Sequence, residues 1–263
     1  MSESEFQLVR AAGFVAAAAL ALAIQGLRPH DPSYRARPVN LALWLINGVL
    51  VGLACGACAW TAAGWAEAAR TGLFNRVHLP AWATVLLSIA ALDLVSYAWH
   101  RANHRIPLLW RFHQVHHSDR CFTVSTAVRF HPGEILLSLP VRLLAIVALG
   151  APVAGVIAFE VVFAFSNLFE HGNIRLPLRL EQRLAGLLVT PALHRRHHAC
   201  RRPELDSNFA TIFSFWDRLL GTFGDNSSAA RFPIGLPGAP SARTLPEVLL
   251  LPLTAGRDAD APS

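Results

Sequence analysis

The sequence contains no lysine and few charged residues of either sign. Its 263 residues include 23 basic residues, all arginine, and 17 acidic residues, so that charged residues make up 15% of the chain. About a quarter is usual for a soluble protein. Four cysteines are too few for a fold held together by disulfides. Hydrophobic residues make up 53% of the chain and the mean hydropathy is +0.38. This composition excludes intrinsic disorder and predicts an integral membrane protein.

Long apolar segments predict about four to five membrane spans, because a helix crosses the hydrocarbon core with roughly 20 mostly apolar residues. Such segments occur at residues 8–24, 41–63, 82–99 and 135–169. The last is long enough for two passes, and Gly150 and Pro152 predict the break between them. Residues 2–5 are Ser-Glu-Ser-Glu, unlike a cleaved signal peptide, so we expect the first span to be retained. Val248–Leu253 is too short to span and is expected to lie at the interface or to pack on the cap.

The arginines predict an orientation. Residues 27–39 and 100–133 are strongly basic, whereas residues 66–80 are less so. The positive-inside rule then places the N-terminus outside and these basic segments, with residues 172–263, in the cytosol. Because the basic residues flank apolar spans, we do not expect nucleic-acid binding. Arginine without lysine, alongside abundant alanine, suggests a GC-rich bacterium and its cytoplasmic membrane.

The expected fold class is therefore all-α: a multi-span helical membrane bundle with a cytosolic helical cap. We expect N-terminal membrane spans in residues 1–80, a catalytic domain carrying the histidine motifs in 81–225, and a flexible C-terminal tail in 226–263.

Histidines are concentrated in one part of the chain. Of twelve, ten lie between residues 100 and 198. Besides His131, they form one HxxxH motif and two HxxHH motifs, with one further histidine standing alone: His100 and His104; His113, His116 and His117; His194, His197 and His198; and His171. Residues three and four apart share a helical face, so each motif can aim its imidazoles at one point. Protonated together, these imidazoles would repel one another, whereas a metal keeps them neutral and bound. The motifs predict a metal centre.

The number of histidines favours two ions, because a single zinc site uses three or four ligands. Imidazole suits Zn, Cu, Fe and Ni alike, and a redox site beside lipid favours iron. Asp93 and Tyr97 lie on the same helical stripe as His100 and His104. Asp93 could accept the second ring N–H of a bound histidine, or it could pair with an arginine between helices. Asn167 lies one turn before His171.

Several phrases around these histidines extend the pattern. They are Asp93-x-x-x-Tyr97-x-x-His100-Arg101, Trp110-x-x-His113-x-x-His116-His117-Ser118, Arg129-Phe130-His131-Pro132, Phe169-Glu170-His171-Gly172-Asn173, Asp206-Ser207-Asn208-Phe209 and Trp216-Asp217-Arg218-Leu219-Leu220-Gly221-Thr222. In this order they resemble the fatty acid hydroxylase/sterol desaturase superfamily of membrane di-iron enzymes. The resemblance covers roughly residues 85–225.

The resemblance implies a non-haem di-iron centre that uses O2 to hydroxylate or desaturate a lipid alkyl chain or a sterol-like substrate. It implies Asn167 as the holder of a metal-bound water, and it leaves open whether His131 is a ligand or a residue that supports the ligands. Its metal ligands would be His100, His104, His113, His116, His117, His171, His194, His197 and His198.

Electrons would come from an external donor, either an electron-transfer protein or a reduced pterin. Two other functions remain open from the residues alone, a membrane metal transporter or storage protein and a zinc-dependent membrane hydrolase. A transporter would place its ligands near the bilayer midplane, and the hydrolase would need one zinc and a nearby carboxylate base.

Overall fold

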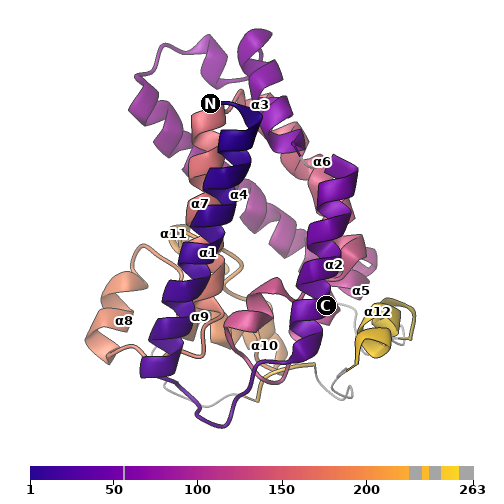
Figure 1. Cartoon of the computed structure of the whole chain (residues 1–263). Coiled ribbons are helices and arrows are strands. Elements are labelled where there is room, and N and C mark those ends of the chain that lie inside the picture. The colour runs from indigo at the N-terminus through magenta and orange to yellow at the C-terminus, as the bar shows by residue number, and fades with distance from the viewer. Residues whose placement is uncertain (56, 225–232, 237–243, 255–263) are drawn as a thin grey trace.

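The computed structural model describes residues 1–263 except 56, 225–232, 237–243 and 255–263 (Figure 1). Within the described residues every regular element is a helix and there is no β-strand. The predicted all-α class is confirmed.

Four helices are long and apolar enough to cross a membrane: α1 (Glu3–Leu27), α4 (Ala81–Arg105), α6 (Pro132–Leu149) and α7 (Val153–Glu170). The predicted multi-span bundle is therefore confirmed. Helix α4 continues beyond the predicted span end at residue 99. Its last turns carry His100 and His104, so the spanning helix itself delivers two histidines to one end of the bundle.

The apolar segment 41–63 is not one continuous helix. It is divided between α2 (Pro38–Cys55) and α3 (Cys58–Ala68), and residue 56 between them lies outside the described residues. The described residues therefore form two helices in the segment where one span was expected.

The predicted hairpin between α6 and α7 is confirmed. Gly150 ends α6 in the left-handed region, with φ 63°, and Pro152 is the N-cap of α7. Gly72 lies directly against this turn, since a Cβ atom there would lie 2.2 Å from the Gly150 nitrogen. The turn therefore needs both glycines, because side chains at either position would collide with the neighbouring backbone.

The main apolar core packs these spans together. Helix α7 packs against both α1 and α4 (Figure 1). Phe6 of α1 and Ile146 of α6 are fully buried, and Leu92 of α4 and Phe159 of α7 are almost so. These contacts fix the ends of α4 and α7, which hold the histidines.

Shorter helices gather at the histidine end of the bundle (Figure 1). They are α5 (Pro107–His117), the 3₁₀ helix η2 (Val124–Val128), α8 (Leu178–Leu184), α9 (Pro191–His197), α10 (Arg202–Leu205) and α11 (Phe215–Leu219). A second 3₁₀ helix, η1 (Phe74–Arg76), lies between α3 and α4. Proline begins both α5 and α9, where its missing N–H has no helical partner to lose. We call α5, η2, α8, α9, α10 and α11 together the cap.

Most of the segment expected as a flexible tail, residues 226–263, lies outside the described residues; its described part contains one helix, α12 (Leu245–Thr254). It packs against α5 and α2, and Val248 is fully buried with Leu43 and Val115. Of the two positions expected for the apolar residues 248–253, at the membrane interface or packed on the cap, these contacts favour the second.

Candidate metal centre

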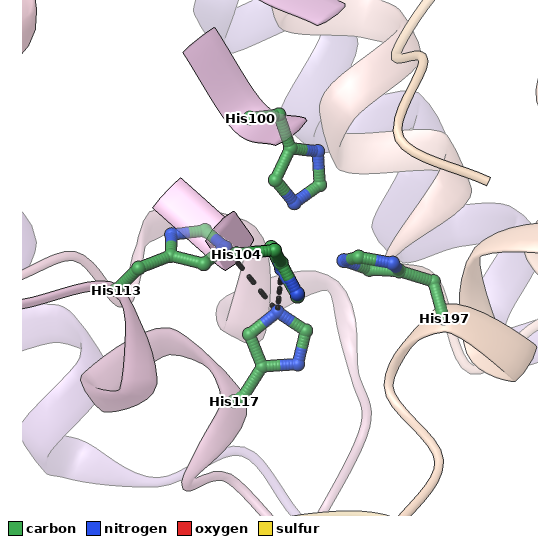
Figure 2. Close-up of side chains that lie close together, drawn as sticks. All are labelled: His100, His104, His113, His117 and His197. Carbon is green, nitrogen blue, oxygen red and sulfur yellow. Dashed lines mark hydrogen bonds between the residues drawn. The ribbon is translucent and has the colours of Figure 1, made fainter. Parts of the chain in front are cut away.

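The nine histidines converge into two adjacent groups. The first holds His100, His104, His113, His117 and His197, and the second holds His116, His171, His194 and His198. Within each group, one ring nitrogen from every member lies within 4.8 Å of those of the others. Figure 2 shows the five rings of the first group turned toward a common centre. The groups adjoin, since the rings of His117 and His198 stack with centroids 4.3 Å apart.

Helical spacing explains how each motif divides between the groups. In His113–His117, the two residues four apart enter the first group, while His116 enters the second. In His194–His198, the outer pair enters the second group and His197 enters the first. Residues four apart lie one above the other on a helix, so each HxxHH motif serves both groups.

The nitrogen separations match those around a metal ion. The Nε2 atom of His117 lies 3.1 Å from that of His104 and 3.2 Å from that of His113 (Figure 2). In the second group, the Nε2 atom of His171 lies 3.0 Å from that of His116 and 2.9 Å from that of His194. Two nitrogens bound at right angles to one ion, each at about 2.1 Å, lie about 3.0 Å apart.

In four of the nine histidines, the opposite ring nitrogen, Nδ1, is held by a partner that fixes the tautomer. Nδ1 of His113 lies 2.8 Å from Oε1 of Glu134. Three more Nδ1 atoms lie 2.7–2.8 Å from a backbone carbonyl oxygen: that of His100 from the oxygen of Phe209, that of His171 from the oxygen of Asn167, and that of His197 from the oxygen of Ser207. An Nδ1–H that donates leaves Nε2 unprotonated, as a metal ligand requires.

Buried ring nitrogens without hydrogen-bond partners supply a further test of fit. Nε2 of His100, Nε2 of His197 and both nitrogens of His198 are buried and make no hydrogen bond. Buried polar atoms are normally paired. A cation at the centre of each group gives the inward-facing nitrogens the partner they lack, so the residues present fit a pair of metal ions.

The electrostatics of the cap keep the histidines neutral. Burial is the main cause that lowers the pKa of His116, His117, His194 and His198 well below the ordinary value, and neighbouring histidines lower it further. Burial also lowers the pKa of His171 to about 3, and that of His197 to about 3. Neutral imidazole is the form that binds metal.

Asp93 does not contact a histidine. Its carboxylate accepts hydrogen bonds from the backbone N–H groups of Ile212 and Phe213, at 3.1 and 3.0 Å. Neither expected partner, a histidine N–H or an arginine, bonds to Asp93 among the described residues, and backbone N–H groups take their place. Asp93 instead fixes the segment in which the Phe209 carbonyl holds His100.

Tyr97 also acts away from the histidines. Its hydroxyl forms a 2.8 Å hydrogen bond with Thr222, and its ring packs edge-on against Phe209. Asp217 accepts from the backbone N–H of Phe209 at 2.8 Å and from the Thr222 hydroxyl at 2.8 Å. Burial is the main cause that raises the pKa of Asp217 to about 6. Tyr97 therefore supports the backbone around Phe209.

Asn167 lies beside the second group. Its backbone oxygen holds His171, and its side-chain amide donates to the Ala127 carbonyl at 3.0 Å. His131 belongs to neither group. It caps α6, where its Nδ1 accepts from the Gly133 N–H at 2.9 Å, and its Nε2 lies 3.2 Å from the Leu249 carbonyl. The expectation that His131 supports the ligands was wrong, because both of its nitrogens are used in joining α6 to α12.

Three acids near the histidines were missed from the sequence. Glu134 holds His113, Glu170 lies 3.8 Å from Nδ1 of His194, and Asp206 lies 3.6 Å from Nδ1 of His104. Glu170 and Asp206 stand in the phrases quoted in the sequence analysis, but neither was given a role there. Glu134 carried no signal, since it looks like an ordinary first-turn acid of a helix.

A buried arginine anchors the helix that carries one HxxHH motif. Arg129 is fully buried and donates to the Val115 carbonyl, the Asn40 side chain and the Ser118 hydroxyl at 2.8–2.9 Å. Burial lowers the pKa of its guanidinium. Asn40 also donates to Asp119 at 2.9 Å. This network ties α5 to α2 and holds the His113–His117 helix in place.

A cavity of about 240 Å³ opens onto both groups. Helices α4, α6 and α7 form its walls. The histidines that line it are His100, His113, His116, His171 and His194, and apolar residues cover most of the rest, including Leu92, Val95, Trp99, Ile135, Val141, Phe159 and Phe163. The cavity therefore joins the histidines to the interior of the spanning bundle.

Comparisons with known proteins agree with this arrangement. The model of the family described as fatty acid hydroxylase matches residues 85–222, just over half of the chain. No solved structure matches the chain.

Three curated relatives show the range of similar proteins. Ornithine lipid hydroxylase OlsE of Rhizobium tropici is 33% identical over 59% of this chain and 46% of its own. Alkylglycerol monooxygenase of Danio rerio is 33% identical over 62% of this chain and 36% of its own. Cholesterol 25-hydroxylase of Homo sapiens is 28% identical over 56% of this chain and 53% of its own. The chain thus matches about half or less of each relative's length. With the family match, these findings show that the chain belongs to the fatty acid hydroxylase family.

Proposed function

We propose that this protein is an O2-dependent membrane oxidoreductase that hydroxylates a lipid alkyl chain or a sterol-like substrate. One observation carries the proposal: two adjacent all-histidine groups open onto an apolar cavity between helices able to span a membrane. We propose the nine histidines as ligands of two iron ions, with five in the first group and four in the second.

The ions would supply the activation of O2 that no amino-acid side chain can provide. The chain's own residues do the rest. Glu134 and the carbonyls of Phe209, Asn167 and Ser207 hold the imidazole protons on Nδ1 and orient the rings. The apolar walls of α4, α6 and α7 exclude water and align the hydrocarbon.

Hydroxylation is favoured over desaturation by the relatives, whose names describe hydroxylases and a monooxygenase. The other two function classes have less support. A transporter would hold its ligands near mid-membrane, whereas His100 and His104 occupy the last turns of α4 and His171 follows the end of α7. A hydrolase with one zinc would leave the second histidine group unexplained.

We also propose the surroundings of the reaction. Electrons would come from an external electron-transfer protein or a reduced pterin, and O2 and the lipid would be co-substrates. The positive-inside rule supports a cytosolic cap in a bacterial cytoplasmic membrane. Exposed arginines on the cap, such as Arg179 and Arg183 of α8, would favour an acidic carrier.

Product analysis tests the proposal. The full chain, reconstituted in lipid with iron and a reductant, is given ¹⁸O2 and a membrane lipid extract. The expected result is a lipid product that contains one ¹⁸O atom and is absent with the His197→Ala variant. Oxygen incorporation that is unchanged in this variant, or no oxidised lipid from iron-loaded protein with several reductants, would contradict the proposal.

A further inference from the structure

One charged side chain lines the cavity far from the histidines. Arg142 of α6 is among its lining residues. It stands ten residues after Pro132 and eight before Gly150, hence about 15 and 12 Å along the axis from the two ends of the helix. Because α6 is long and apolar enough to span a membrane, this guanidinium lies near the middle of a span. Charged groups at that depth are costly and are usually functional.

Two neighbouring helices hold Arg142 in a small ionic cluster. Its Nη2 donates to Oε1 of Glu160 in α7 at 2.5 Å, and Nη1 of Arg10 in α1 lies 3.8 Å from the other carboxylate oxygen. The guanidinium lies 5.7 Å from the centroid of the Phe159 ring. Arg142, Arg10 and Glu160 together carry two positive charges and one negative charge. The cluster therefore favours a further anionic or electron-rich group.

Arg142 has donor capacity left for such a group. Its Nε is buried and makes no hydrogen bond, yet 41% of the side chain is exposed. Along the cavity, the hydroxyls of Ser96 and Ser138 already donate to backbone carbonyls of their own helices. Among the residues that line the cavity, the other two charged side chains, Glu134 and Glu170, lie beside the histidines. Arg142 is thus the charged donor at the opposite end.

We propose that Arg142 is a specificity-determining residue, which binds an oxygen acceptor of the lipid substrate, best a carboxylate, while the carbon to be oxidised lies beside the histidines. This inference rests on the proposed function. Two helices give the distance between Arg142 and the histidines. Along α6, Glu134 beside the histidines and Arg142 are eight residues apart, which corresponds to about 12 Å. Along α7, Glu170 beside the histidines and Glu160, the partner of Arg142, are ten residues apart, which corresponds to about 15 Å.

This separation sets the position of the oxidised carbon. Carbon–carbon bonds of about 1.52 Å, meeting at about 111°, advance an extended chain by about 1.25 Å per carbon. The bound oxygen group and the oxidised carbon should therefore be separated by roughly ten to twelve carbons.

Binding by the full chain in lipid nanodiscs tests the inference without any oxidation. Hexadecanoic acid, hexadecan-1-ol and hexadecane compete for the cavity with a fluorescent fatty acid probe. The wild-type protein is expected to bind the acid about tenfold or more tightly than the hydrocarbon, with the alcohol between them. Arg142→Gln should remove this preference while leaving the affinity for hexadecane unchanged, and Arg142→Lys should retain part of it.

Arg10→Gln is the matched control, because Arg10 also contacts Glu160 but is not among the cavity-lining residues. It removes one positive charge of the cluster but not the donor in the cavity, so it should weaken the preference for the acid less than Arg142→Gln does. Equal wild-type affinity for all three compounds would overturn the inference, and so would a preference that survives in Arg142→Gln. The comparison of the three compounds on the wild-type protein needs no variant, so it tests the inference even if Arg142→Gln fails to fold.

Product analysis separates this inference from the proposed function. If the protein oxidises lipid, the new oxygen should lie roughly ten to twelve carbons from the carboxylate in wild type, and its position should scatter in Arg142→Gln. Oxidation next to the carboxylate would overturn the role of Arg142 and leave the proposed function standing. Preferential binding of the acid without any oxidation would support the role of Arg142 and contradict the proposed function.

Discussion

Removal of Glu134 tests how the chain would hold one of the two proposed ions. Oε1 of Glu134 accepts one hydrogen bond from Nδ1–H of His113 at 2.8 Å and another from the Asn103 side-chain amide at 3.1 Å. Glu134→Ala leaves both donors buried and unpaired, each at a cost of about 1–3 kcal/mol. Loss of such a partner typically weakens metal binding about 10–100-fold. Because His113 belongs only to the five-histidine group, one of the two ions should be weakened and the other retained.

Glu134→Gln is the matched control. The second carboxylate oxygen of Glu134 is buried and makes no hydrogen bond. The amide nitrogen of glutamine can therefore replace this oxygen without the loss of a hydrogen bond. The remaining oxygen can still accept from His113. We expect a loss of less than about tenfold for this variant. The assay is an anaerobic Fe²⁺ titration of the apoprotein against a competing chelator. Two ions weakened together, an unchanged Glu134→Ala, or a glutamine variant as weak as the alanine variant would refute the reasoning.

Three further predictions concern pH and two other residues. The pKa values of His171 and His197, about 3 in the fold, lie below about 6.5 in an unfolded chain. Stability of the apoprotein should be complete above pH 6.5 and fall as the pH drops toward 3, by up to about 1.4 kcal/mol per pH unit for each histidine; melting temperatures that do not change over this range would contradict it. Asp93→Ala should lower iron retention, because the segment that holds the Phe209 carbonyl against His100 loses its anchor; unchanged iron content would remove this role. His131→Ala should keep two irons per chain while lowering the melting temperature, and loss of iron there would show a role in the centre that its contacts do not explain.

The sequence predicted the helical class, the bundle of spans and the nine histidines that converge. These features carry local signals, because apolar length and i, i+4 spacing act within one segment. The division into groups of five and four depends instead on how α4, α5 and α9 face one another. The i, i+4 rule accounts for it afterward, since each pair four apart stays together and the third histidine turns to the other group.

The supports of the histidines were less predictable. Nδ1 of His100 and Nδ1 of His197 bind backbone carbonyls, which every residue possesses, so no residue type marks them. Asp93 was expected to bond to a histidine or an arginine side chain, but its partners are backbone N–H groups more than a hundred residues away. Arg142 was not singled out either, because its surroundings become visible only when α6 and α7 lie side by side.

The number of iron ions bound per chain tests the central claim most directly. The full-length protein is purified without oxygen, loaded with Fe²⁺, freed of excess metal and analysed for iron and protein. Two histidine groups, each with its ring nitrogens within 4.8 Å of one another, predict two irons per chain, falling toward one in a variant that lacks ligands of a single group. One iron per chain in the wild-type protein, or none, would contradict the account.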